Sequence, residues 1–411
     1  MHSQRAARTR IIRSNFADSD YIATSGSASQ TVKPMKFIVM TSTAALGRAL
    51  RQAGIPARFG LTLVLAVGGI LALASGAQQA RTTSAANAAS APGLSAANLS
   101  LLTAEQWLNP PPLRPDDLSG KVVLVNFWTY SCINSLRALP YVRAWADKYR
   151  DRGLVTVGVH TPEFAFEQDI ANVQQAMQWY DVRYPVPTDN RHAIWRAFRN
   201  DGWPAFYLIG ADGRLRYRML GEGDYDRSER SIQGLLSEAF GSPVRDAITD
   251  IVGQGAQAAA AGNDMYSPET YVGYAQTSNF ASPGGVRRNA ANLYQAPTLG
   301  LNQWGLAGVW NVGAEFATLN EPSGSISFRF HSRDIHLVMG SSHGQPVRFR
   351  VKLDGAPPGA NRGVDIDPEG WGTVTAPRLY QLIRQTQPIT DRTLEIEFLD
   401  PGVRAYVFTF G

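Results

Sequence analysis

The residue in this sequence with the most specific chemistry is its single cysteine, Cys132. It follows a continuous apolar run at 121–128 (KVVLVNFW), which predicts a buried strand, and it precedes a helical pattern at 135–150. A thiol at a helix N-terminus faces unpaired backbone N–H groups and the positive end of the helix dipole. Both favour the thiolate, so we expect a lowered pKa for Cys132 and attack on disulfides.

Composition narrows the classes of function. One cysteine in 411 residues rules out an intrachain disulfide framework and a cysteine-rich metal site, and we expect neither a metal nor a cofactor. The net charge of +5 is mostly local, since residues 1–58 hold nine Lys and Arg against two Asp. A basic leader on a nearly balanced body indicates targeting and argues against a nucleic-acid partner.

The leader contains an uncharged apolar segment at 59–74 (FGLTLVLAVGGILALA), preceded by three arginines within 48–58. This order is typical of a signal peptide, and extension to residue 77 brings the segment close to the ~20 residues of a membrane span. Whether the segment is cleaved or retained as an anchor, the rest of the chain is exported, because the positive flank stays inside. We therefore predict a periplasmic protein, or one on the outer face of the cytoplasmic membrane, with targeting residues 1–80 and a linker at 81–100.

Residues 101–245 alternate between strand and helix patterns. Apolar runs predict strands at 121–128, 154–159, 184–188, 204–209 and 215–220, and helical spacing predicts helices at 135–150, 170–180 and 228–240. This alternation predicts an α/β domain around a central sheet.

Residues 301–411 have an all-β pattern after a connector at 246–300. Apolar and polar residues alternate at 325–330, 334–339, 347–353 and 393–398, with turn signals such as Asp354-Gly355 between them. Short strands at this spacing predict a β-sandwich domain of jelly-roll type.

Two motifs of the α/β domain resemble the thioredoxin family. Residues 128–135 (WTYSCINS) resemble its active-site turn, and residues 202–206 (GWPAF) resemble its cis-proline loop. With residues 158–164 (GVHTPEF) after the second strand, the chain most resembles the TlpA-like thioredoxin domain of DipZ-type proteins. Residues 301–411 resemble their C-terminal module, which is carbohydrate-binding-like in fold, whereas their polytopic membrane domain has no counterpart here.

This resemblance implies roles for four residues. Cys132 is the attacking thiol, Pro204 follows a cis bond beside it, and Glu163 moves protons near it. Ser135 stands where the family has a second cysteine, so the mixed disulfide formed by Cys132 cannot be released internally. Monothiol chemistry remains: mixed-disulfide formation, exchange with glutathione, disulfide shuffling or thiol oxidation. Whether Ser135 is natural or introduced is open.

The expected partners are exported proteins that carry disulfides or thiols, together with a small-molecule thiol or a membrane reductant. One alternative is a redox-inactive binding protein, and a weaker one is a one-cysteine peroxidase, whose motif needs a proline where this chain has Val125. A glycan is a further possible partner of the second domain. Four aromatic residues are candidates for stacking on a sugar or for filling a sandwich core: Trp304, Trp310, Trp371 and Tyr380.

An acidic run at 365–369 (DIDPE) has some of the residues of a calcium loop. It lacks the later ligands of an EF-hand, so we predict a solvated turn there.

Overall fold

The computed structural model describes residues 96–411 except 110 and 263, and for 96 and 97 it describes the backbone only. The predicted targeting segment and most of the linker therefore lie outside the described residues. Within the described ranges, no helix combines the length and the apolar character that a membrane span requires.

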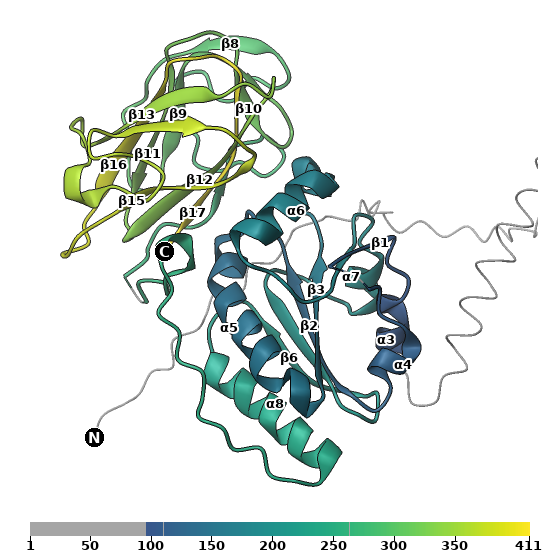
Figure 1. The fold of residues 1–411 in the computed structure, drawn as a ribbon. Coiled ribbons are helices and arrows are strands. Elements are labelled where there is room, and N and C mark those ends of the chain that lie inside the picture. The colour runs from purple at the N-terminus through teal and green to yellow at the C-terminus, as the bar shows by residue number, and fades with distance from the viewer. Residues whose placement is uncertain (1–95, 110, 263) are drawn as a thin grey trace, which may run out of the picture. The chain divides into compact units, whose positions relative to one another are not determined.

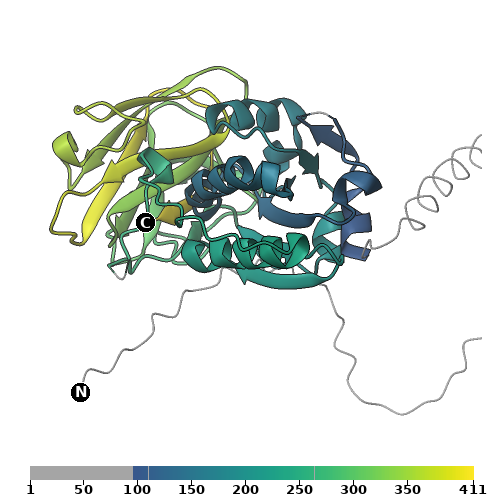
Figure 2. The same ribbon diagram turned by 60° about the horizontal axis from the view of Figure 1, so that its bottom comes forward.

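The first domain runs from α3 to α8 and contains a six-stranded sheet in the order β1-β4-β3-β2-β5-β6. Figure 1 labels these elements, and Figure 2 shows them from a second direction. In chain order they are α3 (Ala96–Leu101), β1 (Gln106–Leu108), α4 (Pro115–Leu118), β2 (Val122–Trp128), α5 (Ile133–Tyr149), η1 (Arg150–Arg152), β3 (Leu154–His160), η2 (Ala165–Gln168), α6 (Ile170–Trp179), β4 (Val186–Thr188), α7 (Ala193–Ala197), β5 (Ala205–Ile209), β6 (Leu215–Leu220) and α8 (Tyr225–Phe240).

The central strand β2 is buried on both faces because helices cover both sides of the sheet. Val122 and Leu124 pack into the core beneath α5, α6 and α8, whereas Val123 and Val125 point into a second core with α3 and α7. Successive side chains of a strand alternate between faces, so one continuous apolar run supplies both cores. Figure 1 shows α5 and α8 side by side on one face of the sheet.

The topology brings three loops to one edge of this sheet. Strands β2 and β3 are parallel, so the turn after Trp128 and the loop after His160 leave at the same end. Strand β5 is antiparallel to β2, with Ala205 opposite Phe127, so the residues before β5 arrive at that end too. The predicted site residues lie on these three loops, apart from Ser135, which lies in the first turn of α5.

The second domain runs from β7 to β17 and is an antiparallel sheet in the order β14-β13-β16-β11-β9-β10-β17-β12-β15, to which β7 adds beside β17 and β8 beside β9. After η3 (Gly255–Gln257), its elements are β7 (Thr270–Tyr271), β8 (Ala291–Tyr294), β9 (Trp304–Val312), β10 (Ala317–Leu319), β11 (Gly324–Phe330), β12 (Asp334–Ser341), β13 (Val347–Leu353), η4 (Gly359–Asn361), β14 (Trp371–Val374), β15 (Arg378–Arg384), β16 (Arg392–Phe398) and β17 (Val403–Phe410).

Aromatic rings fill the hydrophobic core of this domain. Phe328 packs against Phe408 and Phe410, with ring centroids 4.9 and 5.3 Å apart, and Trp310 meets Phe398 at 5.8 Å. All five side chains belong to one buried core. The structure thus confirms the predicted α/β domain with an all-β domain after it, although residues expected only to connect them supply β7 and β8.

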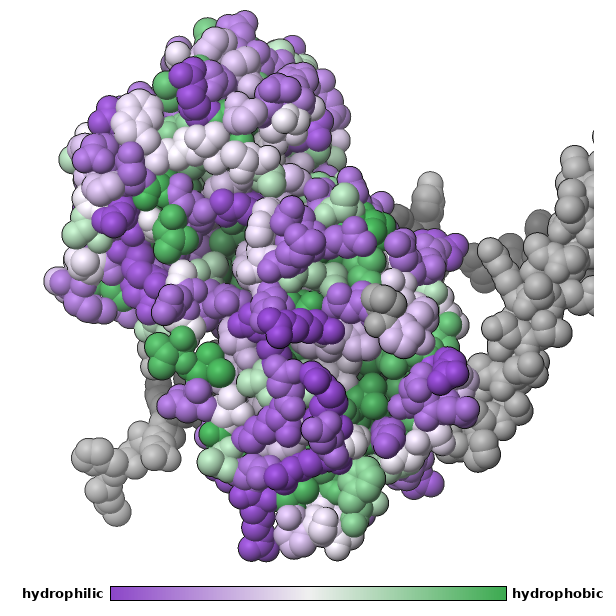
Figure 3. All heavy atoms as spheres, in the orientation of Figure 1, coloured by the Kyte–Doolittle hydropathy of each residue, from purple (hydrophilic) through white to green (hydrophobic). Residues whose placement is uncertain are grey.

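The two domains share apolar contacts. Tyr406 and Val407 of β17 belong to the same buried cluster as the core beneath α5. The Tyr406 ring packs against Phe164 and Phe166 of the loop after β3, with centroids 5.2 and 4.8 Å apart. On the face shown in Figure 3, hydrophilic residues predominate and apolar ones form small groups.

A buried carboxylate, Glu229 of α8, holds the helix that begins after Cys132. Its side chain is 1% exposed and accepts hydrogen bonds from Trp145 Nε1 (3.1 Å), Lys148 Nζ (2.6 Å) and Tyr149 Oη (2.6 Å), all on α5. The backbone N–H of Thr249 donates to it as well, at 2.7 Å. A charge this well satisfied is costly to delete, because its partners are left unpaired.

We therefore expect Glu229→Ala to lower the free energy of unfolding by about 3–5 kcal/mol, the usual loss when one partner of a buried ion pair is removed. Urea titration monitored by circular dichroism measures it. The matched control is Glu238→Ala on the same helix, whose carboxylate is 58% exposed and pairs with Arg216. Its effect should lie within the error of the measurement, and equal losses in both variants would refute this role of Glu229.

Candidate functional site

Cys132 is the N-cap residue of α5 and lies at the edge of the sheet where the three loops meet. Its backbone is extended, with φ −81° and ψ 117°, and its carbonyl accepts from Leu136 N at 3.0 Å. Ser135 is fully buried, and its hydroxyl accepts from the backbone N–H of Thr129 at 3.4 Å. Hydrogen bonding by its backbone and side chain acts to lower the pKa of the Cys132 thiol. The serine at the second position of the motif therefore favours the thiolate without supplying a second thiol.

The Trp203–Pro204 bond is cis, as the motif predicts. The Trp203 carbonyl lies 4.0 Å from the Cys132 sulfur, within reach of the thiol as donor. Trp203 is held by Trp195 of α7, with ring centroids 4.5 Å apart. The proline loop thus faces the thiol, and the structure brings Cys132, Ser135 and Pro204 together.

The expected low pKa of Cys132 is wrong. Only 7% of the residue is exposed, and burial raises the pKa of the thiol far above its ordinary value of 9.0. The carboxylates of Glu163 and Glu269 raise it further, against the lowering effect of the Ser135 hydrogen bonds. Desolvation and nearby negative charge outweigh the helix terminus, so the resting form at neutral pH is the neutral thiol.

Glu163 lies just beyond β3, half-buried, and is close enough to Cys132 to affect its ionisation. Burial raises the pKa of its carboxyl well above the ordinary 4.5, and the charges of Glu269 and Glu167 add to this. The Tyr271 hydroxyl donates to Glu163 Oε1 and opposes the rise. A raised pKa of this kind is typical of a carboxyl that takes part in proton transfer.

Glu167, which the sequence pattern did not single out, ties two of the loops together. It is fully buried and accepts from the Ser131 hydroxyl at 2.6 Å. It also accepts from the backbone N–H groups of Glu163 (2.6 Å) and Phe164 (3.0 Å). This carboxylate therefore positions the residue before Cys132 relative to Glu163. An acidic residue in the first turn of η2 is the sequence signal that could have found it.

Two further residues near the thiol, Glu269 and Tyr271, come from the second domain and were also missed. The sequence pattern places them in a connector, because a two-residue strand leaves no periodicity. Their proximity to Cys132 arises from packing between segments more than 130 residues apart in the sequence.

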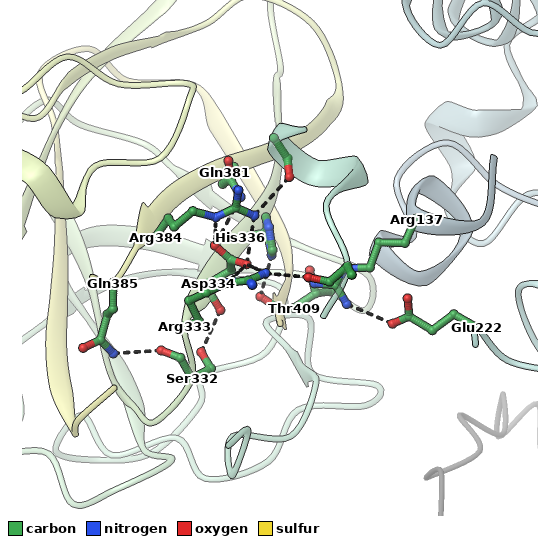
Figure 4. Close-up of polar contacts among 12 residues, drawn as sticks. Arg137, Glu222, Ser332, Arg333, Asp334, His336, Gln381, Arg384, Gln385 and Thr409 are labelled. Atoms are coloured by element: carbon green, nitrogen blue, oxygen red, sulfur yellow. Dashed lines mark hydrogen bonds and ion pairs between the residues drawn. The ribbon is translucent and has the colours of Figure 1, made fainter. Parts of the chain in front are cut away.

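Figure 4 shows two further polar groups away from the sulfur, an ion pair of Arg137 on α5 and a cluster around Asp334 of the β domain. Arg137 is 3% exposed and pairs with Glu222 at 2.9 Å. Burial lowers the pKa of His336 to about 3, and the positive charge of Arg137 adds to this effect. The imidazole is therefore neutral, and its Nδ1 contacts the Thr409 carbonyl at 3.2 Å. Nearby, Asp334 pairs with Arg333 and Arg384 at 2.6 and 2.7 Å.

The four aromatic candidates for sugar stacking differ in their exposure to solvent. Trp304, Trp310 and Tyr380 are buried in the core of the second domain, so they are not available at its surface. Trp371 is 43% exposed, and the Arg350 guanidinium lies 4.9 Å from the centre of its ring. One of the four residues is therefore placed where a ligand could reach it.

The acidic run at 365–369 forms a turn in which both aspartates have protein partners. Asp365 pairs with Arg378 at 2.7 Å, and Asp367 accepts from the backbone N–H of Trp371 at 2.8 Å. Across the part of the chain that the structure describes, no three His, Cys, Asp or Glu side chains are grouped to hold a metal ion.

Comparisons with known proteins agree with this geometry. Residues 120–215 match a family model described as thioredoxin-like, and residues 267–411 match one described as a thioredoxin-like C-terminal domain. DipZ of Mycobacterium bovis is 33% identical over 313 residues, which cover 74% of this chain and 41% of DipZ. The chain thus spans about two-fifths of the length of that relative.

Two shorter relatives align with the first domain. The thiol-disulfide oxidoreductase YkuV of Bacillus subtilis is 32% identical over 138 residues, or 33% of this chain and 93% of YkuV. The thiol-disulfide oxidoreductase ResA of Bacillus cereus is 29% identical over 117 residues, or 28% of this chain and 65% of ResA. The resemblance drawn from residues 128–135 and 202–206 is confirmed.

The raised pKa predicts how the thiol ionises. We expect no thiolate absorbance from Cys132 at pH 7, because burial and the two carboxylates keep its proton bound, and we expect the signal to grow above pH 9.0. The measurement is the ultraviolet difference spectrum between the chain and its Cys132→Ser variant, which cancels the tyrosines. A full thiolate signal below pH 7 would mean that the helix terminus dominates.

Proposed function

Because the chain belongs to the thioredoxin-like thiol–disulfide oxidoreductases, we propose that it performs monothiol exchange through Cys132. The observation that carries this proposal is the arrangement of three groups: the thiol at the start of α5, the buried Ser135 in the first turn of that helix, and the carbonyl before the cis proline, 4.0 Å from the sulfur. The thiol, beside the proline loop, can attack a disulfide. Because a serine stands at the second position of the motif, no internal thiol can release the mixed disulfide that forms.

The proposed step exchanges one S–S bond for another. The Cys132 sulfur attacks one sulfur of a substrate disulfide, the substrate S–S bond breaks, and a mixed disulfide forms. The thiol proton passes to Glu163, and the leaving thiolate takes a proton to become a thiol. An external thiol then attacks the mixed disulfide and releases Cys132. The Ser135 hydrogen bonds stabilise the negative charge that develops on sulfur during attack.

We propose exported proteins with disulfides or thiols as the partners, and a small-molecule thiol or membrane reductant as the second substrate. The support is the segment at 59–77, an apolar run behind a basic flank. A reporter enzyme that works only outside the cytoplasm should be active when it is fused after Gly411. Activity of a cytoplasm-dependent reporter would count against export.

Ser135→Cys should convert the monothiol into a dithiol. The residue is buried one helical turn from Cys132 and close enough to affect the pKa of its thiol, so a cysteine there could attack the mixed disulfide. We expect the original chain to stall as a mixed disulfide with insulin, and the variant to reduce insulin over many turnovers with a dithiol reductant. Mass spectrometry identifies the stalled adduct.

The matched control is Ser135→Ala, which removes the hydroxyl without adding a thiol and should stall as the original chain does. Glu163→Gln should slow formation of the adduct by about 100-fold, as expected for loss of a proton acceptor. If the Cys132 adduct never forms and Ser135→Cys gains no activity, the site is inactive and a binding protein is the better description.

A further inference from the structure

The second domain places two polar side chains against the carboxylate beside the thiol. We infer that Glu269 and Tyr271 share a proton with Glu163 across the domain boundary and thereby set the pH at which Cys132 reacts. The effect on reactivity rests on the proposed function, but the sharing of the proton does not. Both residues act through Glu163, so they are positioning residues.

Strand pairing fixes the segment that carries them. Strand β7 pairs antiparallel with β17, with Tyr271 opposite Val407, and the backbone N–H of Val272 donates to the Tyr406 carbonyl at 2.8 Å. Thr270 and Val272, on either side of the tyrosine, are fully buried. The Tyr271 backbone is therefore part of the β domain, while its side chain points to the thioredoxin-like domain.

The contacts of the Tyr271 hydroxyl connect two acids. It donates to Glu163 Oε1 and lies 3.5 Å from Glu269 Oε2. Its ring also faces Phe164, with centroids 6.3 Å apart. All three polar side chains are half-buried. One hydroxyl between two carboxyl groups gives a chain of groups along which a proton can be shared.

Electrostatics favour retention of that proton. Burial raises the pKa of Glu269 to about 7, and the negative charge of Glu269 raises the pKa of Glu163 further. Two other acidic groups, Glu167 and Glu315, lie around the pair, and Arg404 of β17 lies near Glu315. Because two neighbouring carboxylates resist ionising together, the pair keeps one proton near neutral pH. Glu163 can then accept the Cys132 proton while Glu269 holds the proton that the two carboxyl groups share.

The two residues act on Glu163 in opposite directions, which gives a specific test. Glu269→Gln removes a negative charge, so Glu163 should ionise at lower pH. Tyr271→Phe removes a hydrogen bond to the carboxylate, so Glu163 should ionise at higher pH. We therefore follow the alkylation rate of Cys132 over a pH range that spans neutrality, and we expect its pH midpoint to move down in the first variant and up in the second.

The experiment uses the full chain, iodoacetamide as the probe and mass spectrometry of the adduct across this pH range. Tyr274→Phe in the same segment and the exposed Glu321→Gln are the controls and should leave the profile unchanged. Circular dichroism verifies that each variant is folded. Unchanged profiles in both test variants, or equal shifts in one direction, would overturn the inference.

A parallel reaction with an aromatic disulfide separates the two proposals. Opposite shifts in alkylation, combined with no reaction toward the disulfide, would support the shared proton and refute the exchange function. Reaction with the disulfide, combined with unshifted profiles, would refute the shared proton and leave the exchange function standing.

Discussion

The constraint on which this site depends is the burial of a thiol that must become charged to react. At 7% exposure, water does little to stabilise a thiolate at Cys132, and two carboxylates oppose it. The surrounding groups therefore have to supply what water does not. Hydrogen bonding by Ser135 lowers the pKa of the thiol, and in the proposed function Glu163 takes its proton. Chemistry of this kind would be controlled by proton movement more than by a standing thiolate.

The loop after β3 joins this chemistry to the architecture. Within the first domain, Glu167 of this loop accepts hydrogen bonds from the backbone of residues 163 and 164 and from the hydroxyl of Ser131. Toward the second domain, Phe164 and Phe166 of the same loop pack on Tyr406 of β17. The same few residues thus hold the active-site turn and the domain contact. The two domains share one apolar cluster, so the β domain is part of the environment of the thiol and cannot be treated as a separate appendage.

Sequence patterns predicted the parts of this molecule that depend on local order. The run at 121–128 became β2, the alternating strands of the second domain formed at the expected places, and the cis bond before Pro204 agreed with its motif. The predicted direction of the Cys132 pKa shift was wrong, because the burial that raises this pKa depends on tertiary packing and not on the position of the residue at a helix N-terminus. Glu269 and Tyr271 were missed for the same reason, and three of the four proposed sugar-stacking aromatics proved to be core residues.

A lone buried sulfur also affects how the chain behaves under oxidising conditions. With one cysteine in 411 residues, no wrong internal crosslink can form while the chain folds. A covalent dimer would require two Cys132 sulfurs, each in a residue that is only 7% exposed, to approach within about 2.05 Å. This bond should therefore form more slowly between two folded chains than between unfolded ones. Covalent dimers in an oxidised preparation would then come mainly from molecules that unfolded before they were linked.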